Sequence, residues 1–388
     1  MSDVQIHGEV DEGYGVVADA FRANFDERGE LGAAFSLYVD GRQRVDLWGG
    51  VADKASGRPW SADTLQLVFS TTKGIAATCI AMLVQRGALG YDDKVADHWP
   101  EFAAAGKGEI TVGQMLSHQA GLIAVDDRLD FDSIMSVTPM VDALAAQAPL
   151  WPLGTGHGYH AITYGWLAGE LIARVDGRRI GQFVREELAA RLGLDMWIGL
   201  PESEEERVST IEVATAAPTD PAAIEMMMKV LGPGTNGYRA LTLDGVIRTM
   251  PENHFNSRAL HATEMPGANG ITTARSLARM YAATIGDVDG TRLLAHDTMQ
   301  AARTERANGP DLTLVAETRF GAGYMLHCAS QPMIQDGSFG HPGAGGSLGF
   351  ANPELGIGFG YVMNQMGSDL VGDARHNALA DATLAAIS

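Results

Sequence analysis

Ser70 and Lys73 stand three residues apart at the start of an apolar stretch of this 388-residue sequence, and the pair could supply a nucleophile and its base. Apolar residues recur after Ser70 at spacings of three and four, which predicts a helix from about Ser70 to a stop signal at Gly87. On such a helix the Lys73 amine lies on the face of Ser70 and can reach its hydroxyl. A serine needs a base to accept its proton, and a lysine amine becomes that base when desolvation or a nearby cation lowers its pKa.

The start of the predicted helix would also stabilise negative charge. The first backbone N–H groups of a helix have no partner within it, and they lie at the positive end of its dipole. Both features favour the charge that develops on an ester oxygen under attack. Residues 70–73 are therefore a candidate reactive centre, although about one or two Ser-x-x-Lys spacings arise by chance in a chain of this length. The alternative is a helix cap followed by a solvated lysine.

Composition favours a soluble, cytoplasmic protein that acts on small neutral molecules. The formal charge is −20 and the pI is near 4.8, so nucleic acid and anionic membrane surfaces would repel the chain. The N-terminus has neither the basic nor the apolar region of a signal peptide, and no apolar run is long enough to cross a bilayer. No sequence pattern indicates an oligomeric state.

Neither the cysteines nor the acidic residues indicate a metal or a cofactor. Cys79 and Cys328 lie far apart in apolar surroundings, which favours free core thiols over a disulfide. No zinc spacing is present, and the acidic runs at residues 126–130 and 202–206 lack the spacing and the glycine of a calcium loop. We therefore expect solvated loops at both runs, no metal and no cofactor.

Predicted strands lie near both ends of the chain, and predicted helices fill its middle. This order implies an α/β (α+β) domain formed by both termini, residues 1–85 and 265–388, with a mostly helical region, residues 86–264, inserted into it. A cleft between the two parts would suit a ligand. The expected elements are a helix at 11–28, strands at 33–39 and 45–51 joined by a turn at 40–42, helices at 95–98, 111–117, 139–148, 163–175 and 180–192, strands at 324–326, 346–351 and 357–363, and a final helix at 374–386.

Three segments together resemble the serine β-lactamase and penicillin-binding-protein superfamily, and most closely its β-lactamase-like carboxylesterases, the family VIII esterases. Residues 70–73 are similar to the first motif of the superfamily, residues 110–122 to its LLxHxSGL segment, and residues 269–281 to its NGxxTARxLARxY segment. The resemblance covers nearly the whole chain. It implies the β-lactamase/transpeptidase fold, an antiparallel sheet flanked by helices with an inserted helical region.

The resemblance also implies roles for individual residues. Ser70 would be the nucleophile, Lys73 its general base, and Tyr159, in the second motif, a partner of Lys73 in proton transfer. A phenol with a pKa of about 10 can relay a proton when a cationic lysine stabilises its phenolate. The alternative is a tyrosine that packs at the entry of the next helix. Ala161 replaces the asparagine of the Tyr-x-Asn motif, so a side-chain amide is missing there.

The third motif falls at His341, Pro342 and Gly343, where β-lactamases have Lys-Thr-Gly. By this resemblance, His341 and Gly343 would line the substrate site. Ala344 would donate its backbone N–H to the oxyanion, beside the N–H of Ser70. His341 could tune the site or simply pack.

Ser347 lies in a Gly-x-Ser-x-Gly sequence, residues 345–349, of the kind that marks the nucleophile elbow of α/β-hydrolases. That elbow requires a strand, a sharp turn and then a helix, whereas the residues after Ser347 predict a strand. We therefore expect a structural role for Ser347.

The sequence as a whole predicts a serine hydrolase that cleaves small carboxylic esters through an acyl-Ser70 intermediate. A β-lactam or amide hydrolase, or an acyltransferase, of the same superfamily is the alternative within enzymes. A binding module that keeps the fold without turnover is a third hypothesis. Ser70, Lys73 and Tyr159 count against it, because a non-catalytic protein has no chemical reason to keep all three.

Overall fold

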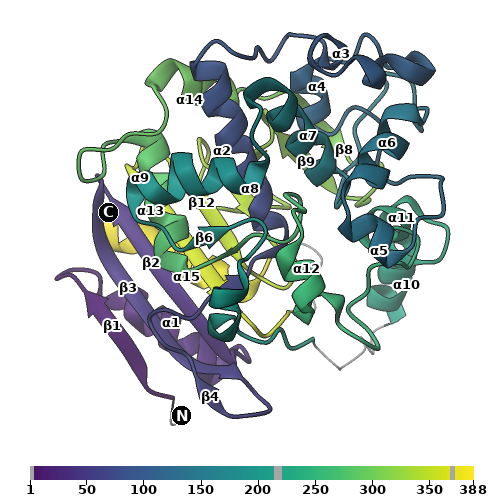
Figure 1. Cartoon of the computed structure of the whole chain (residues 1–388). Helices are drawn as coiled ribbons and strands as arrows, with labels where there is room; N and C mark the ends of the chain where they lie inside the picture. The colour runs from purple at the N-terminus through teal and green to yellow at the C-terminus, as the bar shows by residue number, and fades with distance from the viewer. Residues whose placement is uncertain (1–3, 214–220, 368–371) are drawn as a thin grey trace.

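A ten-stranded antiparallel sheet forms the centre of the computed structural model, which describes residues 4–213, 221–367 and 372–388 (Figure 1). Its strands are β1 Ile6–Val10, β2 Gly32–Val39, β3 Arg42–Asp53, β4 Arg58–Pro59, β8 Ala307–Pro310, β9 Glu317–Phe320, β10 Met325–Leu326, β11 Phe339–Pro342, β12 Leu348–Asn352 and β13 Ile357–Met363. Their order across the sheet is β1-β3-β2-β13-β12-β11-β10-β9-β8, and β4 also pairs with β3. Phe35 of β2 lies opposite Tyr361 of β13, so strands from both ends of the chain meet in one sheet.

A two-residue turn, Asp40 and Gly41, joins β2 to β3. Both residues have positive φ angles, 51° and 74°, as the tight turns of hairpins require. The sequence predicts this hairpin with a turn one residue longer. The observed turn is shorter because Arg42 already pairs with Val39.

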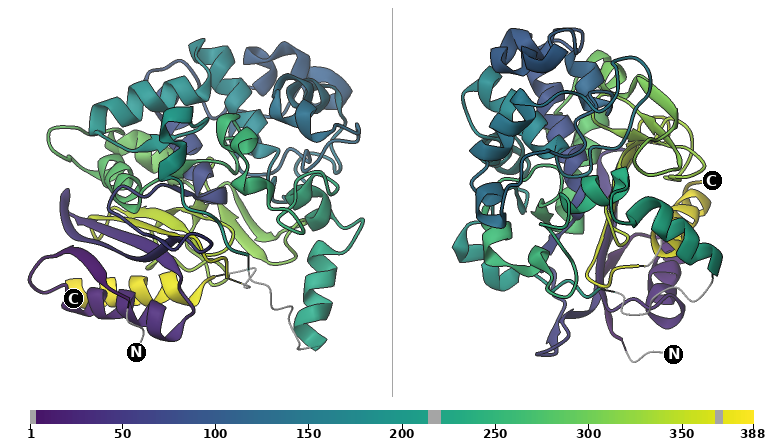
Figure 2. Two further views of the ribbon diagram at one scale, coloured as in Figure 1. Left: turned by 60° about the horizontal axis from the view of Figure 1, so that its bottom comes forward. Right: turned by 90° about the vertical axis from the view of Figure 1, so that its right-hand side faces the viewer.

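Helices cover both faces of the sheet (Figure 2). The helices α1 (Gly15–Glu27) and α15 (Ala374–Ile387) pack against each other on one face, and α13 (Ala274–Ile285) packs on the other. Glycine lets α13 approach the strands closely, since a Cβ atom at Gly360 of β13 would lie 2.3 Å from the Ala274 carbonyl oxygen.

The helical part of the chain lies over the α13 face (Figure 2), and a second sheet of three short strands joins it to the terminal parts. These strands are β5 Gln66–Leu67, β6 Met196–Trp197 and β7 Ile271–Thr272, in the order β5-β7-β6. The sequence predicts none of these three strands, because two residues are too few to show a periodic pattern. The other helices are α2 Thr72–Gln85, α3 Val95–His98, α4 Val112–Leu116, α5 Phe131–Met135, α6 Thr138–Ala146, α7 Tyr164–Asp176, α8 Ile180–Phe183, α9 Ala190–Leu192, α10 Pro221–Leu231, α11 Asn236–Thr242, α12 Arg258–Ala262 and α14 His296–Arg303.

The helix α2 is buried on all sides, although the sequence predicts a single apolar face. Every residue from Thr72 to Leu83 is buried, and α7, α14 and β11 pack around them. A helix that is apolar all round belongs in a core. The helix begins at Thr72 and not at Ser70, because Ser70 lies in the 3₁₀ turn Phe69–Thr71 that precedes it.

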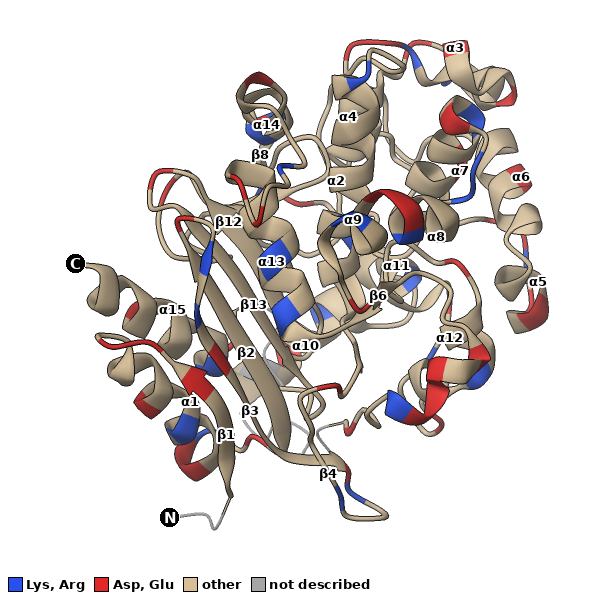
Figure 3. Ribbon diagram, turned by 60° about the vertical axis from the view of Figure 1, so that its left-hand side comes forward, with Lys and Arg blue, Asp and Glu red and all other residues tan. Residues whose placement is uncertain are grey.

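Charged residues lie mainly in the outer helices and loops (Figure 3). The strands β12 and β13 carry no charged residue, which suits their place at the centre of the sheet. No helix among the described residues is long and apolar enough to cross a membrane.

Both cysteines are free thiols, as the sequence predicts. Cys79 is buried in α2. Cys328 is only half-buried, and its sulfur lies 3.3 Å from the Ser330 hydroxyl oxygen, so it is not the core residue that its apolar neighbours in the sequence indicate.

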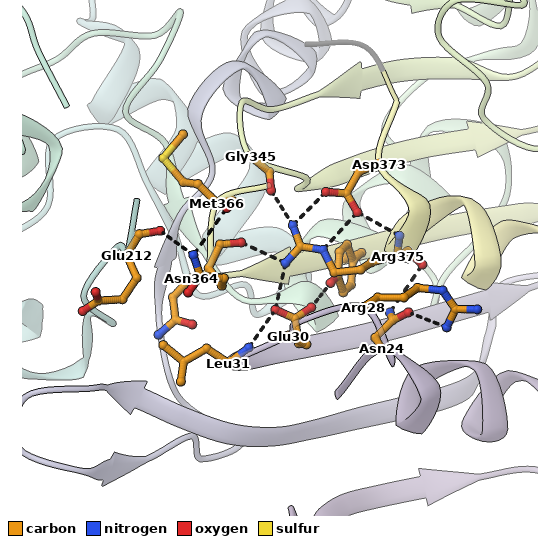
Figure 4. A network of polar contacts seen from close by, with 12 residues as sticks. Asn24, Arg28, Glu30, Leu31, Glu212, Gly345, Asn364, Met366, Asp373 and Arg375 are labelled. Atoms are coloured by element: carbon orange, nitrogen blue, oxygen red, sulfur yellow. Dashed lines mark hydrogen bonds and ion pairs between the residues drawn. The ribbon is translucent and has the colours of Figure 1, made fainter. Parts of the chain in front are cut away.

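A buried network of charged side chains ties α15 to the sheet and to the segment after α1 (Figure 4). The Arg375 guanidinium donates to Glu30 at 3.1 Å and to both carboxylate oxygens of Asp373. The Tyr361 hydroxyl donates to the second carboxylate oxygen of Glu30. The side chains of Arg375 and Glu30 are 4% and 0% exposed, so each charge depends on its partner.

Glu30→Gln is expected to become more stable relative to the wild type as the pH rises from about 5 to about 8. Burial raises the pKa of Glu30 from 4.5 to about 7, and the nearby Asp373 carboxylate adds to the rise. The Arg375 guanidinium and the Tyr361 phenol act in the opposite direction but do not offset the effect of burial. The folded wild type therefore binds this proton more tightly than the unfolded chain does, and it loses free energy of unfolding as the pH rises through that window. Glutamine does not titrate. The measurement is the melting temperature of both proteins across this pH range. A difference in melting temperature that stays constant with pH would contradict the prediction.

Candidate active site

Ser70 lies partly exposed in the 3₁₀ turn Phe69–Thr71, between β5 and α2. The Thr72 hydroxyl holds this turn, because it donates to the Phe69 carbonyl at 2.5 Å and accepts the Gly270 N–H at 2.7 Å. Phe69 has a φ of 45°, in the left-handed region that a bulky residue rarely adopts. The strained turn thus presents Ser70 at the N-terminus of the buried helix.

The Lys73 amine lies within hydrogen-bond distance of three oxygens. Its Nζ is 3.1 Å from Ser70 Oγ, 2.6 Å from the Ala161 carbonyl oxygen and 2.7 Å from the Gly267 carbonyl oxygen. The two carbonyls can only accept, so they take two of the N–H bonds. The remaining position on the nitrogen faces Ser70, and in a neutral amine that position is the lone pair.

Burial controls the protonation of Lys73. The side chain is 0% exposed, and it forms no ion pair with any residue in the described part of the chain. Desolvation lowers the pKa of Lys73 well below its usual range. A lysine with a lowered pKa is the kind of base that can accept the proton of a serine hydroxyl.

Tyr159 lies beside both residues and is 5% exposed. Lys73 Nζ is 4.7 Å from the centre of its ring, and the Ser70 hydroxyl is near enough to the phenol to influence its pKa. The Asp311 carboxylate accepts the backbone N–H of Tyr159 at 3.0 Å. Burial raises the pKa of Tyr159 above its usual range, so the phenol keeps its proton at neutral pH. The fold therefore brings together three residues that the sequence predicts as a site.

Two histidines that the sequence analysis does not select, His118 and His160, lie against this cluster. His160 Nε2 accepts the Leu122 N–H at 2.9 Å, so its Nδ1 carries the proton and donates to the Gly158 carbonyl at 2.7 Å. His118 Nδ1 accepts the backbone N–H of His160 at 3.1 Å, and its ring centre is 5.0 Å from that of Tyr159. Burial lowers the pKa of both rings, that of His160 to about 3. These neutral rings hold the backbone around Tyr159, and the histidine of the LLxHxSGL segment is the signal that could have selected His118.

His341 is 1% exposed and stacks on Tyr159, with 5.8 Å between the ring centres. Its Nδ1 lies 2.7 Å from the Pro342 carbonyl oxygen. Burial, with a smaller contribution from the nearby Lys73, lowers the pKa of His341 to about 3. The imidazole is therefore neutral at pH 7, and it adjoins the predicted substrate site through the ring of Tyr159.

The turn at residues 343–346, between β11 and β12, lies against the segment that precedes Ser70. Gly343 is so close that a Cβ atom there would stand 2.2 Å from the Val68 carbonyl oxygen. Ser347 ties the two segments together, because its hydroxyl donates to that carbonyl at 2.9 Å. Ser347 is 1% exposed and is followed by the strand β12, so it does not form a nucleophile elbow.

This arrangement is suited to nucleophilic acyl chemistry. A partly exposed hydroxyl at a helix N-terminus has a buried amine and a buried phenol as immediate neighbours, and both can carry its proton. Among the residues that the structure describes, no group of three or more His, Cys, Asp or Glu side chains could hold a metal ion.

The fold and the site together define the class of protein. The antiparallel sheet flanked by helices, with Ser-x-x-Lys at the entry of a buried helix, is the arrangement that the sequence motifs predict. A family model described as Beta-lactamase matches residues 17–383. The chain belongs to this family, and the predicted fold class is confirmed.

Individual relatives refine this assignment. Esterase/beta-lactamase LipL of Mycobacterium tuberculosis is 36% identical over 372 residues, which cover 95% of this chain and 85% of that protein. A penicillin-binding protein homolog from Caulobacter crescentus is 41% identical with a TM-score of 0.88, over 98% of this chain and 100% of the other. A structure described as a family VIII carboxylesterase is 36% identical, also with a TM-score of 0.88 and the same coverage. The predicted resemblance to family VIII esterases is confirmed.

Proposed function

We propose that the protein is a carboxylesterase that hydrolyses small esters through an acyl-Ser70 intermediate. The observation that carries this proposal is the Lys73 amine, which is fully buried, lies 3.1 Å from Ser70 Oγ and has two backbone carbonyls as its other partners. A neutral amine held in this way directs its lone pair at the serine hydroxyl, as a general base must. Relatives that are named as esterases, LipL among them, support the same assignment.

In acylation, Ser70 Oγ bonds to the carbonyl carbon of the ester while its proton passes to Lys73. The carbonyl oxygen becomes an oxyanion, to which the backbone N–H groups of Ser70 and Ala344 donate. Ala344 is exposed in the turn at residues 343–346, next to Gly343, which packs against the Val68 carbonyl oxygen and Thr71 on either side of the Ser70 segment. The bond from carbon to the alcohol oxygen then breaks, and the leaving alkoxide takes the phenolic proton of Tyr159.

Tyr159 connects the two proton transfers. Its phenol lies near Ser70 and its ring centre is 4.7 Å from Lys73 Nζ, so the phenolate can accept the proton that Lys73 received. In deacylation, water attacks the acyl carbon and gives a proton to Lys73. Ser70 Oγ leaves and recovers a proton from Tyr159, which Lys73 restores. An alcohol in place of water would give acyl transfer.

A β-lactam or amide hydrolase is the second candidate, because the chain belongs to the beta-lactamase family and LipL is named for both activities. Two departures favour esters. Where β-lactamases have a cationic lysine and a threonine hydroxyl, this chain has a neutral His341 and Pro342. Ala161 offers no side-chain amide, and its carbonyl is bound to Lys73. An ester carbonyl needs neither contact.

We expect kcat/KM for p-nitrophenyl acetate and p-nitrophenyl butyrate to exceed that for a chromogenic cephalosporin by about a hundredfold. Each lost contact with a charged or polar group is worth about 1–3 kcal/mol, and losing two corresponds to roughly that factor. All three substrates are measured under one set of conditions. Comparable values, or a preference for the lactam, would favour the β-lactam hydrolase. Failure to turn over any substrate would favour the binding module.

A further inference from the structure

We propose that Arg375 is a positioning residue for the oxyanion, because it orients the backbone N–H of Ala344 through the turn at residues 343–346. The inference rests on the proposed function, in which Ala344 donates to the oxyanion. Arg375 lies at the start of α15, on the sheet face opposite α13, and it acts through the backbone without touching the substrate.

All five N–H bonds of the buried Arg375 guanidinium have an acceptor (Figure 4). Nε and Nη2 donate to the two carboxylate oxygens of Asp373 at 3.0 and 2.7 Å. Nη1 donates to Glu30 at 3.1 Å and to the Gln365 carbonyl at 2.8 Å. The second bond of Nη2 goes to the Gly345 carbonyl at 2.6 Å, and this contact joins the guanidinium to the turn.

Two peptide units connect that contact to Ala344. The Gly345 carbonyl and the Gly346 N–H belong to one trans peptide unit, so they point in opposite directions. The Gly346 N–H donates to the Gly343 carbonyl at 3.2 Å. That carbonyl shares a peptide unit with the Ala344 N–H, which again points the opposite way. When Arg375 holds the Gly345 carbonyl, the hydrogen bond from the Gly346 N–H to the Gly343 carbonyl therefore fixes the orientation of the Gly343–Ala344 peptide plane. The Ala344 N–H lies in that plane.

The turn needs such an external hold because it is rich in glycine. Gly345 and Gly346 have φ angles of 82° and 126°, and glycine leaves the backbone free to leave these conformations. The Gly367 N–H also donates to the Gly345 carbonyl, at 2.9 Å. The hydrogen bond from Arg375 is shorter and comes from a charged guanidinium, so it is the stronger of the two. It also polarises the peptide unit between Gly345 and Gly346, which strengthens the hydrogen bond that the Gly346 N–H donates.

The test compares Arg375→Lys with the matched variant Arg178→Lys. Arg375 pairs with two carboxylates and Arg178 with three, those of Asp176, Glu186 and Glu187, but Arg178 lies between α7 and α8 and has no contact with the turn. A lysine has three donors and cannot replace the five of a guanidinium. In Arg375→Lys the buried carboxylates keep a cation, while the Gly345 carbonyl loses its charged donor.

We expect Arg375→Lys to lower kcat for p-nitrophenyl acetate about tenfold or more, with KM within about twofold, because an oxyanion donor acts in the transition state. A second readout is the ratio of kcat/KM for the ester to that for its thionoester. Sulfur is a weak hydrogen-bond acceptor, so this ratio reports the donors at that one atom. It is expected to fall at least about threefold in Arg375→Lys and to stay unchanged in Arg178→Lys.

A wild-type ratio in a folded Arg375→Lys enzyme overturns the inference, whatever its kcat. If that variant shows no cooperative melting transition, Asp373→Asn decides instead, because it keeps Arg375 and removes one of the charges that anchor it. The ratio is then expected to fall by a smaller factor, and an unchanged ratio overturns the inference. A wild-type protein that hydrolyses no ester refutes the proposed function itself.

Discussion

Replacement of Ser70 by alanine is expected to lower kcat/KM for p-nitrophenyl esters at least about ten-thousandfold. Without the hydroxyl no acyl-enzyme forms, and the remaining rate comes from substrate binding and the oxyanion donors. Ser70 is partly exposed, and the turn around it is held by Thr72, so the variant should fold. Initial rates at matched protein concentration measure the effect, and melting temperatures report folding.

A fluorophosphonate provides the control for this assignment. Intact mass should show one adduct on the wild type and none on Ser70→Ala, and peptide mapping should place the adduct on Ser70. Ser347→Ala is the matched variant, since the Ser347 hydroxyl donates to the Val68 carbonyl and is buried away from solvent. It should keep the label and most of the turnover. Equal loss of activity in two folded variants would contradict the choice of Ser70.

Lys73→Ala and Tyr159→Phe are each expected to lower kcat by about a hundredfold to ten-thousandfold, the range for removal of a positioned proton carrier. Lys73 takes the proton of Ser70, and the phenol of Tyr159 protonates the leaving alcohol. The measurement uses an alkyl ester such as ethyl butyrate, because an alkoxide leaves only with a proton, whereas a p-nitrophenolate does not need one.

Activity of the wild type should fall at acid pH, where Lys73 becomes protonated. Burial lowers the pKa of the Lys73 amine, but the amine still titrates.

Lys107→Ala and Tyr324→Phe are matched controls for these two variants. Lys107 is also a buried lysine that donates to three backbone carbonyls, and Tyr324 is a buried tyrosine whose hydroxyl contacts Thr78. Both controls should retain kcat within about threefold of the wild type, since neither group contacts Ser70. A near-normal kcat in Tyr159→Phe would show that the second motif lies elsewhere.

Elements with strong local signals could be predicted from the sequence. The strand β13 and the short helix α3 have the predicted bounds, and α15 ends within one residue of its predicted end. Their signals are apolar runs, helix stops and glycine turns, which act within a few residues. The full burial of α2 was not predictable in this way, because it depends on α7, α14 and β11, which are distant in the sequence. The division into two domains stays a prediction.

The residues of the site fall into the same two groups, those with a signal in the sequence and those that depend on the tertiary structure. Ser70 and Lys73 could be paired from their spacing on one helix, and Tyr159 and Ala344 from family motifs. The two neutral histidines beside Tyr159 were missed, because a histidine in sequence gives no sign of the hydrogen bond that sets its tautomer. The network around Arg375 was missed for a similar reason, since Arg375 and Glu30 are 345 residues apart.

The amino-acid sequence by itself determined which chemical groups the protein has and which of them are close neighbours along the chain. It placed a hydroxyl and an amine one turn apart and put apolar residues behind them. The tertiary structure decided what that amine can do. The carbonyls that hold Lys73 come from Ala161 and Gly267, 88 and 194 residues away, and the burial that lowers its pKa comes from elements packed around α2. A pKa depends on solvation and on the direction of nearby dipoles, and both are properties of the folded chain.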